Sequence, residues 1–326
     1  MKKIFVTGGA GYIGSHCVVS LIENGYTPII LDNFSNSHLG VIKKLETITK
    51  KKIIFYNLDL RNKKKLKSIF AKHTCYCVIH CAGFKAVSES IKKPIYYFDN
   101  NIGSTLSLLE CMQEKKIFKL IFSSSATVYN PDQPVPLKES SKIGKTTNAY
   151  GTSKYLIERM LMDVVKSNTK WSIVIARYFN PIGNHFSGLI KENPQGLPNN
   201  LFPNIIKVAK KEVSYLKVFG KNYPTRDGTG VRDYVHVMDL AKGHIAILKN
   251  NKLKKGIEIY NFGTGKGSSV LEIVRAFEKR IGISIPLQFK KRRIGDVPFS
   301  FCNCSKAFKK LSWKAKYNIN QIIDDI

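Results

Sequence analysis

The feature that most constrains the fold of this chain is a glycine-rich turn near its start. Gly8, Gly11 and Gly14 follow a short apolar run at residues 3–7, and apolar residues at helical spacing come after them. A strand, a glycine turn and a helix in this order are typical of dinucleotide binding, because the glycines let the backbone approach a pyrophosphate and the helix N-terminus favours negative charge. Asp32 ends the next apolar run, where an acid can accept hydrogen bonds from an adenosine ribose. An acid there would repel a 2′-phosphate, so the motif favours NAD over NADP.

Apolar runs then alternate with helical patterns as far as residue 180. This alternation predicts an α/β fold built on a doubly wound parallel sheet of the Rossmann type. The expected strands lie at residues 28–31, 53–56, 77–80, 118–122 and 172–176, and the expected helices lie at 66–73, at 87–113 and around Tyr150. Ligands bind at the carboxyl ends of such strands, so Asp59, Lys85, Ser125 and residues 177–180 should gather on one edge.

Beyond residue 180 the chain becomes rich in glycine, proline and asparagine, which is typical of loops. Helices are expected at 203–211, from Asp239, and at 270–280, with a strand at 216–219. We expect residues 1–180 to form an NAD-binding domain, with a returning segment around 232–262. Residues 181–326 are expected to form a smaller, mixed α/β substrate-binding lobe over the strand edge.

The formal net charge of +30 permits two interpretations. Basic clusters at 50–52, 63–65 and 290–293 could bind a nucleic acid or another anionic surface. Alternatively, the lysines simply cover all exposed faces, which their dispersion along the chain favours, so no nucleic-acid partner is expected. No apolar run approaches the roughly 18 residues of a membrane span, so no membrane partner is expected either.

Seven cysteines are scattered through the chain. The pairs Cys75/Cys77 and Cys302/Cys304 lack the wider spacing and the histidine partners of a zinc site, so no metal is expected. Free thiols indicate a reducing cytoplasm. The apolar run at residues 4–6 is too short for a signal peptide and is expected to be a strand.

Tyr150 and Lys154 are four residues apart, with Ser123, Ser124 and Ser125 upstream. On a helix the two side chains would be neighbours, and an ammonium beside a phenol lowers the phenol pKa from its usual value of about 10. Tyr150 could then accept a proton near neutral pH. By itself such a pair is more often a solvated helix face, so its role depends on the rest of the chain.

Several motifs together identify a resemblance. Gly8-x-x-Gly11-x-x-Gly14, residues 123–129 and Tyr150-x-x-x-Lys154 resemble the extended short-chain dehydrogenase/reductase family. Within it, residues 11–16, 82–87, 177–181, 194–201 and 227–234 resemble the UDP-glucose 4-epimerases. The resemblance extends from residue 3 to about residue 313.

The resemblance implies a homodimeric isomerase that interconverts UDP-galactose and UDP-glucose by transient oxidation at C4 with tightly bound NAD. Tyr150 would take the 4′-OH proton and return it. Lys154 would hold the phenolate charge and bond the nicotinamide ribose, and Ser125 would hydrogen-bond the 4′-OH. Another epimerase or a nucleotide-sugar dehydratase remains the alternative, although a dehydratase would need an acid/base pair near residues 124–126, where no carboxylate is present. A basic nucleic-acid-binding protein is the remote alternative.

The resemblance also implies the contacts of both ligands, and no metal. The implied NAD contacts are Gly8, Gly11, Tyr12, Ile13, Gly14, Asp32, Asn33, Phe34, Ser35, Asn36, Ser37, Asp59, Leu60, Cys81, Ala82, Gly83, Phe84, Lys85, Asn100, Ser125, Tyr150, Lys154 and Phe179. The implied UDP-sugar contacts are Lys85, Ser125, Tyr150, Asn180, Asn200, Leu201, Val218, Arg232, Arg293, Asp296 and Ser300. Family members carry either a large tyrosine or a small residue at the position of Ser300, so this serine implies room for UDP-N-acetylhexosamines.

Overall fold

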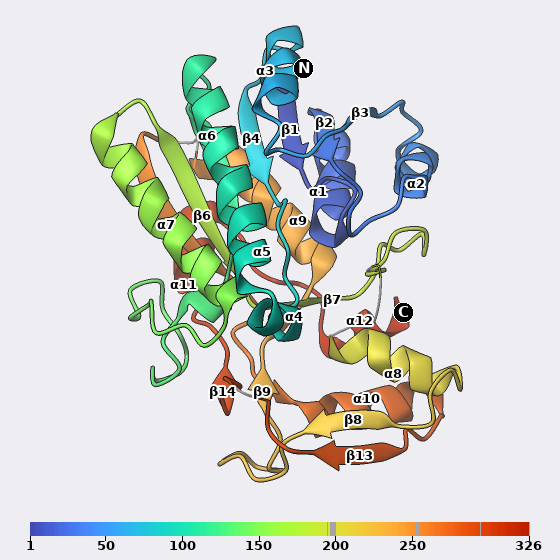
Figure 1. Cartoon of the computed structure of the whole chain (residues 1–326). Helices are drawn as coiled ribbons and strands as arrows, with labels where there is room; N and C mark the ends of the chain where they lie inside the picture. Colours follow the sequence, from blue (N-terminus) through green and yellow to red (C-terminus); the bar gives the residue numbers. More distant parts are fainter. Residues whose placement is uncertain (194, 196–199, 252–253, 294, 326) are drawn as a thin grey trace.

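A seven-stranded parallel sheet forms the centre of the computed structural model, which describes residues 1–193, 195, 200–251, 254–293 and 295–325 (Figure 1). The strand order is β11-β6-β5-β4-β1-β2-β3. The strands are β1 (Lys3–Thr7), β2 (Thr27–Asp32), β3 (Ile54–Asn57), β4 (Cys77–His80), β5 (Lys119–Ser125), β6 (Ser172–Tyr178) and β11 (Gly256–Phe262). The order reverses between β1 and β4, and such a reversal opens a crevice for ligands at the carboxyl edge. The predicted doubly wound α/β fold is confirmed.

Helices cover both faces of this sheet because the strands are apolar on both sides. On β1, Ile4 and Val6 belong to one hydrophobic core and Phe5 to the other, as expected when successive side chains alternate. One face packs against α1 (Tyr12–Glu23), α2 (Gly40–Thr49), α9 (Val237–Ala246) and α11 (Ser305–Leu311). The other face packs against α3 (Lys63–Lys72), α6 (Ser104–Glu114) and α7 (Ala149–Ser167).

The single helix expected at residues 87–113, with Pro94 near its start or at a kink, is broken in the structure. α4 (Val87–Lys92) ends before Pro94, which begins α5 (Pro94–Phe98). Proline lacks an N–H and fits the first turn of a helix better than its interior. A π-helical turn, Asp99–Gly103, then leads into α6.

Most of the remaining elements form a second group with a core of its own, below the sheet in Figure 1. It comprises α8 (Leu201–Ala209), β8 (Leu216–Phe219), α10 (Val270–Ile281), β13 (Leu287–Lys290) and α12 (Ile319–Asp324). Short strands connect it to the sheet: β7 (Asn180–Ile182), β9 (Val231–Arg232), β10 (Tyr234–His236), β12 (Ser268–Ser269) and β14 (Phe299–Ser300). The domain boundaries expected from the sequence stay a prediction. Within the described residues, every helix is too short or too polar to span a bilayer.

A buried ion pair joins α7 to the sheet. The Arg177 guanidinium donates from Nη2 to Glu158 Oε2 at 2.6 Å and from Nε to Oε1 at 3.0 Å, and both side chains are at most 1% exposed. Ser124 Oγ also donates to Glu158 Oε1. The two charges are therefore held by several hydrogen bonds, which a buried ion pair needs in order to offset its desolvation.

We predict that Glu158→Gln lowers the free energy of unfolding by about 3–5 kcal/mol, because it leaves the Arg177 charge buried without a counter-ion. Urea denaturation of the variant and the parent protein measures this difference. Asp132→Asn is the matched control, since it removes an exposed pair with Lys145 and should leave the denaturation curve nearly unchanged. An unchanged stability of the Glu158→Gln protein would contradict the role given to the pair.

Candidate active site

A cavity of about 460 Å³ lies along the carboxyl edge of the sheet. Its walls come from the glycine turn, the loops after β2, β3 and β4, the π-helical turn and the start of α7. Except for Phe34, Ser125 and Phe179, all the residues with an implied NAD contact line this cavity. Of the residues with an implied sugar-nucleotide contact, only Lys85 and Tyr150 line it.

The glycine turn brings two stretches of backbone unusually close together. A Cβ atom on Gly14 would lie 2.1 Å from the Gly8 carbonyl oxygen, so no other residue fits there without moving the turn. Gly8 has a φ of +65°, which favours glycine. Gly11 is the N-cap of α1 and, within the described part of the chain, no side chain caps this helix. The first-turn N–H groups of α1 are therefore suited to an anionic ligand.

The Asp32 carboxylate connects the glycine turn to the loop after β2. It accepts hydrogen bonds from Ala10 N at 2.9 Å, from Phe34 N at 2.8 Å and from Ser37 Oγ at 3.2 Å. Burial raises the pKa of Asp32 above its usual range, and these hydrogen bonds act against that effect. The acid is thus fixed in position at one end of the cavity.

Tyr150 and Lys154 lie on the first turns of α7, which begins after Asn148. The Asn148 side chain accepts a hydrogen bond from Gly151 N at 2.9 Å and so caps the helix. Lys154 Nζ donates to the Ser123 carbonyl oxygen at 2.7 Å, and burial lowers the pKa of Lys154 to about 8. Both side chains line the cavity.

The expected effect of Lys154 on the pKa of Tyr150 is wrong. Burial is the dominant effect and raises the pKa of Tyr150 above its usual value, and only a hydrogen bond with Ser125 opposes it. The Lys154 ammonium is directed instead at the Ser123 carbonyl. Desolvation of the phenol, which residue spacing cannot reveal, outweighs the helical proximity of the two groups.

Ser125 ends β5, and its Oγ accepts hydrogen bonds from Thr127 N at 3.2 Å and from Thr127 Oγ1 at 3.0 Å. Among the three consecutive serines, Ser123 and Ser124 line the cavity. Ser125 does not line the cavity, but its side chain forms a hydrogen bond with Tyr150, which does.

Sequence reasoning missed an ion pair at the cavity wall. Lys85 Nζ lies 2.6 Å from Glu192 Oε1, and the same oxygen accepts a hydrogen bond from Asn200 Nδ2 at 2.6 Å. Lys85 and Glu192 are 107 residues apart, so no local signal could have paired them. Glu192 thereby joins the loop after β4 to the start of α8.

A second group of polar residues lies on β9 and on the loop after β13. Arg232 Nη2 donates to Asp296 Oδ1 at 2.9 Å, and the Arg293 guanidinium stacks over the Phe219 ring at 4.0 Å. The Gly295 carbonyl oxygen accepts a hydrogen bond from Thr147 Oγ1 at 3.4 Å, three residues before Tyr150 in the sequence. This loop therefore touches the segment that leads into α7.

The other implied substrate contacts lie on several elements. Ser300 lies beside Arg232 in the register of β14 and β9, and Asn180 begins β7. Leu201 begins α8, while Val218 is 1% exposed within the smaller core. Pro194 and residues 196–199, which belong to the motif at residues 194–201, lie outside the described residues.

Comparison with known proteins gives consistent results. Residues 4–263 match the NAD dependent epimerase/dehydratase family. The chain is 48% identical to the UDP-glucose 4-epimerase of Neisseria meningitidis serogroup C over 325 residues, covering 100% of this chain and 96% of the relative. It is 47% identical to the UDP-glucose 4-epimerase of Mus musculus over 332 residues, with the same coverage.

Comparison with solved structures also gives UDP-glucose 4-epimerases. UDP-glucose 4-epimerase from Bifidobacterium longum, in complex with NAD+ and UDP, superimposes with a TM-score of 0.97 at 46% identity, covering 99% of this chain and 96% of that one. The family match spans most of the chain, and the relatives share nearly half of its residues over their whole length. The resemblance to UDP-glucose 4-epimerases is therefore confirmed, and the chain belongs to the NAD dependent epimerase/dehydratase family.

Proposed function

We propose that this protein interconverts UDP-galactose and UDP-glucose by transient oxidation at C4 of the sugar, with NAD as a tightly bound cofactor. The observation that carries this proposal is the shared cavity. Tyr150 and Lys154 line the same cavity as the glycine turn and Asp32. A proton acceptor, a cation and a dinucleotide-type turn therefore open into one space.

The residues of the cavity fit NAD. The glycine turn brings bare backbone and an uncapped helix N-terminus to the position suited to a pyrophosphate. Asp32 suits a ribose hydroxyl and would repel a 2′-phosphate. When bound, NAD accepts the hydride from C4 and later returns it.

The chain itself supplies the proton chemistry. No carbonyl acidifies the hydrogen at C4 of the sugar, so direct deprotonation is not available and the 4′-OH must lose its proton as C4 is oxidised. We assign this proton to Tyr150 Oη. In this structure burial raises the pKa of Tyr150 and the hydrogen bond with Ser125 only partly offsets that effect, so the phenolate also needs a nearby positive charge. Lys154, whose pKa is about 8, and the nicotinamide cation of bound NAD would supply that charge.

Arg232 and Arg293 are proposed to bind the UDP pyrophosphate. Guanidinium groups form bidentate, charge-assisted hydrogen bonds to phosphate oxygens. Arg232 forms an ion pair with Asp296 in this structure, and a bound phosphate would compete with the Asp296 carboxylate for the guanidinium group. A relative from Stenotrophomonas maltophila, solved with NAD and formylated UDP-arabinopyranose and 39% identical, supports a UDP-sugar as the substrate class.

The free thiols support our proposal that the protein is located in the cytoplasm.

We also propose a homodimer through α5, α6 and α7. These helices expose Ile95 (82%), Leu106 (45%) and Leu156 (38%), apolar side chains that a second copy could cover. Sedimentation equilibrium should give twice the mass of the chain, and a monomer at micromolar concentration would refute this arrangement.

A wider sugar specificity is predicted from Ser300. Ser300 of β14 lies beside Arg232 of β9, and its small side chain should leave room for a 2-acetamido group. A UDP-Glc/GlcNAc 4-epimerase from Campylobacter jejuni is 31% identical to this chain, with a TM-score of 0.86. The protein should convert UDP-N-acetylglucosamine, and Ser300→Tyr should lose this reaction while keeping UDP-glucose turnover. If the parent protein leaves UDP-N-acetylglucosamine unchanged but converts UDP-glucose, the prediction is wrong.

Tyr150→Phe is predicted to lower kcat for UDP-galactose by a factor of about 10²–10⁴, the usual contribution of a positioned acid-base group. The phenylalanine retains the ring but cannot take a proton. Tyr155→Phe, on the same helix and outside the cavity lining, should retain the parent rate. Turnover followed by separating UDP-glucose from UDP-galactose measures both variants. Full activity of Tyr150→Phe would refute the assignment.

A further inference from the structure

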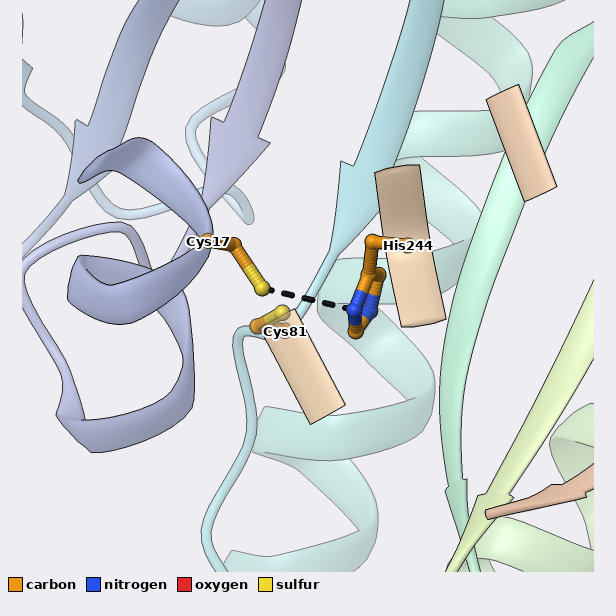
Figure 2. Close-up of side chains that lie close together, drawn as sticks. All are labelled: Cys17, Cys81 and His244. Atoms are coloured by element: carbon orange, nitrogen blue, oxygen red, sulfur yellow. Dashed lines mark hydrogen bonds between the residues drawn. The ribbon is translucent and has the colours of Figure 1, made fainter. Parts of the chain in front are cut away.

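Three potential metal ligands lie close together next to the cavity of the candidate active site, and one of them, Cys81, lines that cavity. Figure 2 shows Cys17, Cys81 and His244 pointing toward one another. Cys17 lies on α1, Cys81 follows β4, and His244 lies on α9. Their ligand atoms are all within 4.8 Å of one another, and Cys17 Sγ is 3.4 Å from His244 Nδ1.

We propose that these three side chains bind one Zn²⁺ ion. Zinc prefers a tetrahedral site with Zn–S distances of about 2.3 Å and Zn–N distances of about 2.0–2.1 Å, which places neighbouring ligand atoms roughly 3.5–3.8 Å apart. The distance of 3.4 Å between Cys17 Sγ and His244 Nδ1 already corresponds to one edge of such a tetrahedron. The other edges are at most 4.8 Å, so small side-chain rotations would complete the site.

A chain of hydrogen bonds supports these ligands from outside. His244 Nε2 lies 2.7 Å from the Tyr178 hydroxyl, which lies 2.9 Å from Ser123 Oγ. Ser123 Oγ in turn donates to Cys81 Sγ at 3.1 Å. If His244 Nε2 carries the ring proton, every bond in this chain donates in one direction, from the imidazole toward the sulfur. Metal-ligating histidines usually donate their second N–H in this way, which fixes the ring and leaves Nδ1 free for the metal.

The charges of the site also suit a buried divalent cation. Cys17 and His244 are buried, and Cys81 is partly buried and lines the cavity. Binding of Zn²⁺ releases the protons of both thiols, so the ion and two thiolates carry no net charge. A neutral complex avoids most of the penalty of burying an isolated charge. The fourth coordination position remains for a water molecule, which could enter beside Cys81 from the cavity.

Metal binding must displace one existing contact. His244 Nδ1 lies 2.9 Å from the Leu240 carbonyl oxygen, to which it can donate a hydrogen bond when it carries the proton. Coordination requires the proton to move to Nε2, where the Tyr178 hydroxyl accepts it. The site is therefore able to exist in a metal-free and a metal-bound form without a change of fold. Within the described ranges, this is the sole group of cysteine, histidine and acidic ligands with suitable spacing.

Cobalt(II) provides a direct test on the purified full-length protein with its bound dinucleotide, because Co²⁺ occupies zinc sites and thiolate coordination gives a charge-transfer absorption band. We expect a band that saturates at one Co²⁺ per chain and disappears when one equivalent of Zn²⁺ is added. Cys17→Ser should lose the band but keep its turnover of UDP-galactose, because Cys17 does not line the cavity.

Cys304→Ser is the matched control, since it removes one thiol of a pair, Cys302 and Cys304, whose sulfur atoms lie 2.9 Å apart. This variant should keep the band. Absence of the band in the parent protein, its persistence in Cys17→Ser or its loss in Cys304→Ser would each overturn the proposal.

X-ray absorption of the zinc-loaded parent protein tests the proposal without any variant. It should show two sulfur ligands at about 2.3 Å, and a shell without sulfur would overturn it. Neither spectroscopic readout uses catalysis, so their outcome is independent of the proposed epimerase activity.

Discussion

The arrangement of the candidate site depends on how one face of α7 is held against the sheet. Tyr150, Lys154 and Glu158 are spaced four residues apart and therefore lie on one side of the helix. Glu158 binds Arg177 of β6 and Ser124 of β5, two residues that stand opposite each other in the register of these strands. One turn earlier, Lys154 donates to the Ser123 carbonyl oxygen. These buried bonds fix both the rotation and the height of the helix, and Tyr150 follows as the next residue on the same face.

The loop after β4 is fixed by the same helix. Asn101, in the π-helical turn, accepts a hydrogen bond from Phe84 N at 2.8 Å and donates to Ser153 Oγ of α7 at 3.0 Å. The loop carries Cys81 and Lys85, so the wall of the cavity and the proton acceptor are positioned by one connected set of contacts. The glycine turn forms the opposite wall by a different means, the close approach of Gly14 to the Gly8 carbonyl.

Local sequence patterns were sufficient for the fold and for the dinucleotide-type turn, whereas the roles given to Tyr150 and Lys154 depend on the family resemblance. Apolar runs predicted all but the last strand of the central sheet, and the spacing of Gly8, Gly11 and Gly14 predicted the turn between β1 and α1. Long-range contacts were not predictable. Glu192 reaches Lys85 across 107 residues, and Cys17 reaches His244 across 227. The pKa of Tyr150 was predicted in the wrong direction because the spacing indicates the neighbour but not the loss of water around the phenol.

The central claim is that oxidation and reduction at C4 take place on one bound dinucleotide, with Tyr150 holding the proton. Its most direct test is incubation of the purified protein, without added NAD, with UDP-galactose that carries deuterium at C4. The account predicts UDP-glucose that retains the deuterium at C4, because the hydride never leaves the site. Deuterium lost to water, or no conversion until NAD is supplied, would contradict it.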